Sequence, residues 1–224
     1  VRGALAEGGI ALQTVKDHVV FERSQVLTGG GTPYGVFTPY KNAWLRTLSA
    51  HPQSLATLGT EGLGAQLAPL PQGVSAGVPP LAELGFEPVN LPLESGSSGA
   101  QALLADFLDR IDAYDRARDF PAIKGPSYLS VHLRFGTVSI RTLARAAHER
   151  MVAGSRGAEV WLSELIWRDF YHQVLHHHPA VGRGRAFRPE YDRIHWESGA
   201  QADAHFRAWC EGRTGYPLVD AAML

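Results

Sequence analysis

The sequence predicts a short α/β remnant followed by an all-α domain. Residues 1–10 have the pattern of a helix that ends at Gly8 and Gly9, which are typical helix-terminating residues. DHVVFE at 17–22 is a short apolar run flanked by charge, which is typical of a strand. From residue 101 onward, apolar residues recur at helical spacing instead.

The next elements are a helix and a long connection. TPYKNAWLRTL at 38–48 predicts a helix with Thr38 as its N-cap and Pro39 at its first position. Residues 49–100 carry most of the Pro and Gly and show poor periodicity, so we interpret them as a connection between domains.

The C-terminal half is predicted to be helical throughout. QALLADFLDRIDAYDRAR at 101–118 places apolar residues on one helical face, and Ser139 caps a helix over 139–153. Further helices are expected at 158–177, around 200–210 and from near Pro217.

Composition limits the classes of function. The chain has 224 residues and a net charge of −1, so any contact with DNA must be local. Residues 134–213 hold 12 Arg against 9 acidic residues, which makes the C-terminal half the better place for such a contact. No apolar run is long enough to cross a bilayer, and no signal peptide is visible. A single cysteine, Cys210, excludes an internal disulfide, and we expect a cytoplasmic protein.

The stretch WLSELIWRDFY at 161–171 is the most informative part of the chain. On a helix, Trp161, Arg168, Glu164 and Trp167 spread over an arc of roughly 120°. Glu and Arg are almost never buried unless they are paired, so this face suits a helix between two flat ligands. The alternative is ordinary core packing with a surface pair between Glu164 and Arg168.

A second stretch, GPSYLS at 125–130, places small and hydroxyl residues just ahead of an apolar segment. Backbone N–H groups and Ser hydroxyls at the start of a helix can bind phosphate. The alternative is a simple turn and cap.

WLSELIWRDFY closely resembles the flavin-domain motif of the DNA photolyase/cryptochrome family. Four other segments resemble the same family in the same order, with the closest similarity to microbial cyclobutane pyrimidine dimer photolyases: VFTPYKNAWL at 36–45, RDFPAIKGPSYLSVHLRFGTVSIRTL at 118–143, HHPAV at 177–181 and GRTGYPLVDAAM at 212–223.

The resemblance implies a domain organisation. Residues 1–48 would be the end of an N-terminal α/β antenna domain, and 49–100 an interdomain connector. Residues 101–224 would be the N-terminal half of the helical FAD- and DNA-binding domain, that is, the first half of the photolyase helical domain. We therefore expect an internal piece of a longer protein that does not contain the complete function.

The resemblance also implies site residues and ligands. Trp196 would be the outermost member of a Trp electron-transfer chain, although a half-exposed packing role stays open. Glu164 and Trp167 would act on the substrate, and both would contact DNA together with Arg118 and Tyr171. FAD would be bound by Tyr114, Ser127, Tyr128, Leu129, Ser130, Trp161 and Arg168.

The expected function is light-driven repair of pyrimidine dimers in DNA by a deoxyribodipyrimidine photo-lyase, acting as a monomer. An antenna chromophore of folate or deazaflavin type is also implied, but its usual contacts would precede Val1. Two alternatives remain, namely a cryptochrome-type photoreceptor that binds FAD without repair, and a nonfunctional helical fragment. We expect no metal site, because His172 and His176 have no evident third ligand.

Overall fold

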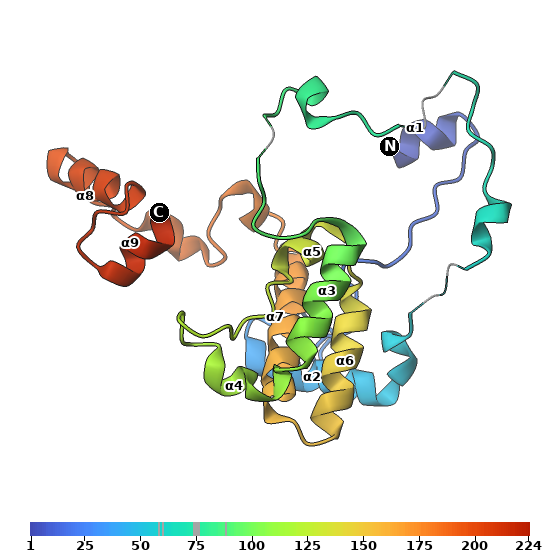
Figure 1. Cartoon of the computed structure of the whole chain (residues 1–224), viewed down its shortest axis with the longest axis horizontal. Coiled ribbons are helices and arrows are strands. Elements are labelled where there is room, and N and C mark those ends of the chain that lie inside the picture. The colour runs from blue at the N-terminus through green and yellow to red at the C-terminus, as the bar shows by residue number, and fades with distance from the viewer. Residues whose placement is uncertain (58, 60, 74–76, 88) are drawn as a thin grey trace. The chain divides into compact units, whose positions relative to one another are not determined.

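The computed structural model describes residues 1–57, 59, 61–73, 77–87 and 89–224, which form two compact units, Val1–His177 and His178–Leu224 (Figure 1). Every regular element in these residues is helical. The first unit contains α1 (Arg2–Glu7), α2 (Phe37–Ala50), η1 (Pro52–Leu55), η2 (Leu63–Gln66), η3 (Leu81–Leu84), α3 (Gly96–Leu108), η4 (Ile111–Ala113), α4 (Tyr114–Ala117), α5 (Ser130–Phe135), α6 (Ile140–Val152) and α7 (Arg156–His177).

The second unit is described by itself. It contains η5 (Val181–Arg183), η6 (Pro189–Arg193), α8 (Ala200–Cys210) and α9 (Pro217–Met223). Asp220 on α9 accepts hydrogen bonds from the backbone N–H groups of Thr214 and Gly215, at 2.7 and 3.0 Å. These bonds close the turn that leads into α9.

Helix α7 is the central element of the first unit. It packs against α2, α4, α6 and η4, and Trp161 of α7 contacts Phe107 of α3 (Figure 1). A Cβ atom at Gly157 would lie 2.0 Å from the carbonyl oxygen of Ile111, so only glycine fits where α7 meets η4. The core side of α7 is a stripe of buried apolar residues that includes Trp161, Leu162, Leu165, Ile166 and Phe170.

The predicted strand at 17–22 is wrong, because this segment is irregular. A strand needs a neighbour that completes its ladder of backbone hydrogen bonds, and the described residues contain no strand. Val20 and Phe21 are nevertheless buried, so their backbone groups need other partners. These partners are side chains of α7.

Asp169 of α7 supplies most of these partners from a fully buried position. Its carboxylate accepts hydrogen bonds from the N–H groups of Val20 and Phe21, at 3.1 and 3.2 Å, and from the indole N–H of Trp44 at 3.0 Å. Gln173, one turn further on, donates to the carbonyl of Phe21 at 3.0 Å. Burial raises the pKa of Asp169, and the three N–H donors oppose that rise.

Most of the predicted helices form, but two details are wrong. Ser139 caps α6, because its hydroxyl accepts a hydrogen bond from the N–H of Arg141 at 3.2 Å. Thr38 is not the N-cap of α2, which starts one residue earlier at Phe37 with Val36 as its N-cap. The Phe37 ring stacks on Trp167 of α7, which explains why Phe37 joins the first turn.

The second wrong detail is the single helix expected over 101–118. The chain forms α3, η4 and α4 instead, and α3 begins earlier, at Gly96. The break lies at η4, whose backbone at Ile111 is in close contact with Gly157 of α7. The predicted apolar face survives the break, since Phe107, Ile111 and Tyr114 are all buried. In the described part of the chain, no helix combines the length and apolarity that spanning a membrane requires.

Replacement of Asp169 by Ala should lower the free energy of unfolding by about 3–5 kcal/mol, because three buried N–H donors lose their acceptor. Asp169→Asn keeps the shape and one acceptor oxygen and should cost less. Trp44→Phe removes one of the three donors together with part of a buried ring and serves as the comparison. Urea unfolding followed by circular dichroism measures these losses, and a loss below 1 kcal/mol for Asp169→Ala would contradict this account.

Candidate functional site

A basic cavity lies between α5 and α7. Its volume is about 590 Å³, and it brings Ser130 at the start of α5 together with Arg168 of α7. The other residues that line it are His18, Leu133, Arg134 and His172. The rings of His18 and His172 are stacked with their centroids 6.5 Å apart. Hydroxyl, guanidinium and imidazole groups in one cavity can bind an anionic group such as a phosphate.

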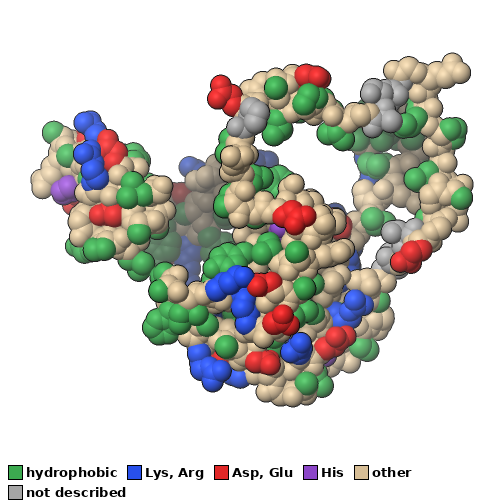
Figure 2. Space-filling view, in the orientation of Figure 1, with side chains coloured by type: hydrophobic (Ala, Val, Ile, Leu, Met, Phe, Trp, Pro, Cys, Tyr) green, Lys and Arg blue, Asp and Glu red, His purple; other side chains and the backbone are tan. Residues whose placement is uncertain are grey.

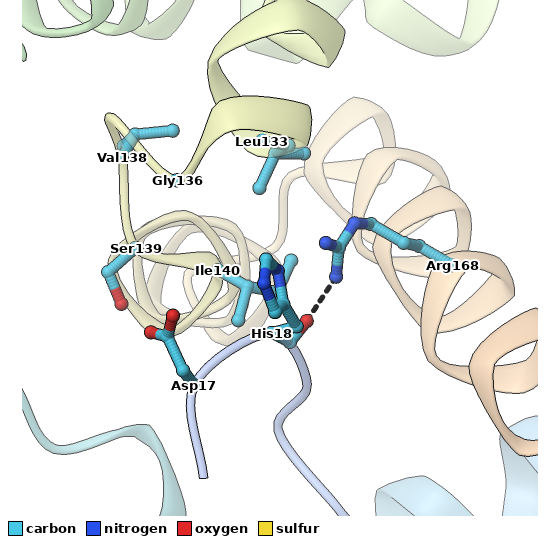
Figure 3. A pocket seen from close by; sticks show the side chains of 8 residues that line it. All are labelled: Asp17, His18, Leu133, Gly136, Val138, Ser139, Ile140 and Arg168. Carbon is cyan, nitrogen blue, oxygen red and sulfur yellow. Dashed lines mark hydrogen bonds between the residues drawn. The ribbon is translucent and has the colours of Figure 1, made fainter. Parts of the chain in front are cut away.

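Arg168 is held in this region by the N-terminal segment. Its guanidinium donates a hydrogen bond to the carbonyl of His18, and it also lines a smaller cavity of about 90 Å³ beside Leu133 and Ile140 (Figure 3). Burial lowers the pKa of Arg168, although an arginine in a protein stays charged. The cavity therefore contains a cation with a defined position.

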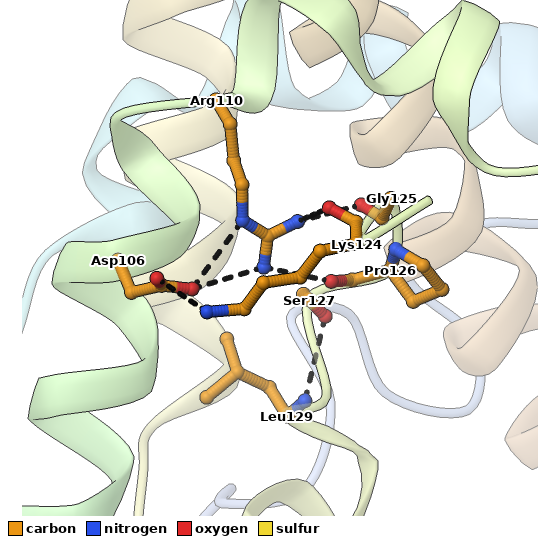
Figure 4. Close-up of polar contacts among 7 residues, drawn as sticks. All are labelled: Asp106, Arg110, Lys124, Gly125, Pro126, Ser127 and Leu129. Atoms are coloured by element: carbon orange, nitrogen blue, oxygen red, sulfur yellow. Dashed lines mark hydrogen bonds and ion pairs between the residues drawn. The ribbon is translucent and has the colours of Figure 1, made fainter. Parts of the chain in front are cut away.

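The segment 127–130 has a strained backbone just before α5. Tyr128 has φ of 57°, a left-handed conformation that costs a non-glycine residue about 1–2 kcal/mol. The N–H of Leu129 donates to the hydroxyl of Ser127 at 3.4 Å (Figure 4). The whole of Leu129, backbone included, is buried, so this residue supports the segment from the core. Ser127, Tyr128 and Ser130 are at least partly exposed.

Two further predicted cofactor residues, Trp161 and Tyr114, also lie in the core. Trp161 is only 3% exposed, and its ring centroid lies 4.6 Å from that of Phe107. Tyr114 packs edge-on against the same Phe107 ring at 5.7 Å, and burial raises the pKa of Tyr114. Core packing therefore accounts for both side chains in this chain.

Glu164 forms an ion pair with Arg118. One carboxylate oxygen of Glu164 lies 2.6 Å from a guanidinium nitrogen of Arg118, and this hydrogen bond raises the pKa of Arg118. The guanidinium also sits over the Tyr114 ring, 5.6 Å from its centroid. The alternative interpretation of this helix paired Glu164 with Arg168 on the surface, but the structure pairs Glu164 with Arg118, just after α4.

Trp167 belongs to a stack of aromatic rings. Phe37 lies parallel to it, with centroids 3.6 Å apart and planes 8° apart. Tyr171, one turn further along α7, stacks on Trp167 with a centroid distance of 5.4 Å and is 57% exposed. The stack gives α7 an aromatic surface that is partly open to solvent.

Trp196 lies in the second unit, whereas all the other predicted site residues belong to the first unit. It is 80% exposed, and no ring contact involves it among the residues that the structure describes. Arg185 of the same unit pairs with Asp192 at 3.7 Å. The described residues contain no group of three His, Cys, Asp or Glu side chains arranged to hold a metal ion.

Sequence reasoning missed three polar residues. Asp169 and Gln173 continue the helical spacing of the buried residues Leu162, Leu165 and Ile166, which was the available signal for polar groups facing the core. Arg110 was also missed, and it binds the backbone just before Ser127 (Figure 4).

The charged surface does not by itself mark a DNA-binding face. Figure 2 shows Lys and Arg side chains interspersed with Asp and Glu side chains over the helical body. A DNA contact on this face would therefore depend on individual charged residues rather than on a large positive field.

Two family models match parts of the chain. The model of the FAD binding domain of DNA photolyase matches residues 161–224, and the model of DNA photolyase matches residues 1–57. The first match includes Trp161, Glu164, Trp167, Arg168 and Trp196.

Two curated relatives carry the name deoxyribodipyrimidine photo-lyase. The protein from Synechococcus is 38% identical over 100% of this chain, and the one from Escherichia coli is 39% identical over 92%. The chain spans 47% and 43% of their lengths, so it corresponds to less than half of each relative.

Solved structures show the same architecture. A bacterial class III photolyase from Agrobacterium tumefaciens aligns over 99% of this chain and 45% of its own, with a TM-score of 0.79 and 27% identity. A cryptochrome from Synechocystis shares the fold, with a TM-score of 0.72 and 22% identity over 99% of this chain and 46% of its own. The order of the matching segments, the identity along the chain and the fold agree, and the chain belongs to the DNA photolyase/cryptochrome family.

Proposed function

We propose that this chain contributes cofactor- and DNA-binding elements to a deoxyribodipyrimidine photo-lyase, which repairs cyclobutane pyrimidine dimers in DNA with light. The main support is the layout of α7. This helix carries Arg168 in the basic cavity, and within four residues it also carries Glu164 and Trp167, which are partly exposed. The names of the curated relatives agree with this proposal.

The cofactor in this proposal is FAD, which when bound and reduced supplies the light-driven electron that splits the dimer. The hydroxyls of Ser127 and Ser130, the backbone at Tyr128 and the guanidinium of Arg168 would hold its diphosphate. Hydroxyl and guanidinium donors around a cavity of about 590 Å³ fit such an anion. Tyr114, Leu129 and Trp161 would support these groups from the core.

The substrate side in this proposal is the partly exposed surface around Trp167. Trp167 and Tyr171 would stack on flipped-out pyrimidines, and Arg118 would bind a DNA phosphate. Glu164 would hydrogen-bond the damaged bases, where a fixed polar group stabilises developing charge. Since Glu164 is paired with Arg118 at 2.6 Å, this role requires the pair to rearrange or to bind the substrate together.

Several finer features belong to the same proposal. Residues 1–48 would end an antenna domain, 49–100 would connect the domains, and 101–224 would begin the helical domain. The whole protein would act as a cytoplasmic monomer, with a folate or deazaflavin antenna chromophore. Trp196 would be the outer end of the path that photoreduces FAD, and its high exposure agrees with that role.

Replacement of Glu164 by Ala should lower the quantum yield of dimer splitting at least tenfold and leave the FAD content unchanged. The matched control is Glu159→Ala, since Glu159 also lies on α7 and also pairs with an arginine at 2.6 Å. Repair is measured by the recovery of thymine absorbance under blue light. An unchanged yield would contradict the substrate role, and a wild-type protein that binds FAD without repairing DNA would favour a photoreceptor.

Replacement of Trp167 by Ala should weaken binding of a dimer-containing oligonucleotide by about 1–3 kcal/mol, because the base loses an aromatic platform. Fluorescence anisotropy with damaged and undamaged oligonucleotides measures this loss. An equal loss for both oligonucleotides would show that Trp167 does not recognise the flipped bases.

Replacement of Arg168 by Ala should deplete the purified protein of FAD, because the cavity loses its fixed cation. Arg156→Ala is the control, since Arg156 lies on the same helix but is exposed and paired with Glu159. The flavin-to-protein absorbance ratio after gel filtration is the measurement. Full retention of FAD by Arg168→Ala would remove Arg168 from the cofactor site.

Replacement of Trp196 by Phe should slow light-driven reduction of oxidised FAD at least tenfold and leave repair by the pre-reduced protein intact. Trp209→Phe, in the same unit, is the control. Equal photoreduction rates in wild type and Trp196→Phe would remove Trp196 from the photoreduction path.

A further inference from the structure

We infer that Arg110 is a positioning residue for the diphosphate-binding segment 127–130, which it orients without touching the ligand. The inference rests on the proposed function, because it concerns the segment that would hold the diphosphate of FAD. Arg110 lies between α3 and η4, and its side chain reaches the chain 14 to 16 residues later (Figure 4).

The guanidinium of Arg110 binds three consecutive carbonyl groups. It donates to the carbonyl oxygens of Lys124 at 2.5 Å, Gly125 at 2.9 Å and Pro126 at 2.9 Å. In an extended chain, successive carbonyls point to opposite sides. Three that converge on one cation therefore require the backbone to curve around it.

Asp106 fixes the direction of this guanidinium. Its carboxylate accepts hydrogen bonds from Arg110 at 3.1 and 3.3 Å and from the ammonium group of Lys124 at 2.7 Å. The planar guanidinium presents its donors in a rigid fork, so a carboxylate bound on one side determines where the other donors point. The network thus joins α3 to both the side chain and the backbone of residue 124.

The bond to Pro126 controls the following peptide group. A trans peptide is planar, and its C=O and N–H point in opposite directions. Because the carbonyl of Pro126 points at Arg110, the N–H of Ser127 must point away from it. Arg110 therefore sets the direction of the first N–H donor of the segment 127–130.

The segment is also held at other points. A Cβ atom at Gly125 would lie 2.4 Å from the carbonyl oxygen of Ala117, so the chain runs tightly against α4 there. The buried Leu129 anchors the other end. Between these points Tyr128 keeps its left-handed backbone, a conformation that persists only when the surroundings enforce it.

Arg110 also removes an electrostatic obstacle. Three carbonyl oxygens carry partial negative charge, and without a cation they would repel an anion bound next to them. Each of the three carbonyl oxygens accepts a hydrogen bond from Arg110, which offsets its partial negative charge. A diphosphate bound at 127–130 would therefore be close to N–H and O–H donors without strong repulsion from these carbonyls.

The test measures FAD and ADP affinity together with amide hydrogen exchange in the whole protein. Arg110→Ala should weaken FAD and ADP binding at least tenfold and accelerate exchange of the amides of 127–130. Arg110→Lys keeps the positive charge but not the planar array of guanidinium donors. Its loss of affinity and its increase in amide exchange should both be smaller than those of Arg110→Ala. Ser130→Ala, which removes a proposed direct ligand, should weaken binding without changing exchange.

Two further variants complete the test: one is a control, and the other replaces Arg110→Ala if that variant does not fold. Arg156→Ala breaks an exposed ion pair with Glu159 on α7 and leaves the Arg110 network intact, so affinity should stay within twofold of wild type. Asp106→Asn weakens the hydrogen bonds that orient the guanidinium but keeps Arg110 itself, and it should weaken FAD binding about threefold. This variant tests the inference even if Arg110→Ala does not fold. Circular dichroism confirms that each variant is folded.

The outcomes separate this inference from the proposed function. If wild type binds FAD and a folded Arg110→Ala binds it equally well with unchanged amide exchange, the inference is overturned and the proposed function stands. If wild type binds neither FAD nor ADP, the proposed function fails and the inference falls with it.

Discussion

The buried carboxylate of Asp169 is the constraint on which the arrangement of the first unit depends. A charged group without solvent needs hydrogen-bond donors, and here they come from the N-terminal segment and from Trp44 of α2. These bonds determine which side of α7 faces inward. On a helix the neighbouring Arg168 is turned by about 100° from Asp169, which directs it to the basic cavity at the edge of the core.

This constraint lets one helix serve two different surfaces. The inward stripe of α7 packs the core, while the arc turned away from it carries Arg168 at one edge, Trp167 at the other and Glu164 between them. The ion pair between Arg118 and Glu164 is about one-third exposed on each side, so it contributes only about 0–1 kcal/mol to stability. Groups that stabilise the fold so little are free to exchange their partners for a ligand.

The family pattern extends over segments with different physical roles. Phe37 lies in the segment 36–45 and supports Trp167 by stacking, so a motif near the N-terminus positions a residue 130 positions later. Residues 17–22 show the opposite case. Their apolar pattern predicted a strand, yet side chains of α7 satisfy the backbone there, because strand formation depends on a neighbour that local sequence cannot supply.

The sequence by itself determined most of the long helices, the cap at Ser139 and the resemblance to the photolyase family, because periodicity, capping and motifs are local properties of the chain. It also identified Arg168 and Ser130, which share one cavity. Only the tertiary structure decided that Trp161 is buried, that Glu164 pairs with Arg118 and that Arg110 binds three carbonyls. These partners lie 14 to 46 residues apart, and the packing of α3, α4 and α7 selects them rather than the spacing along the chain.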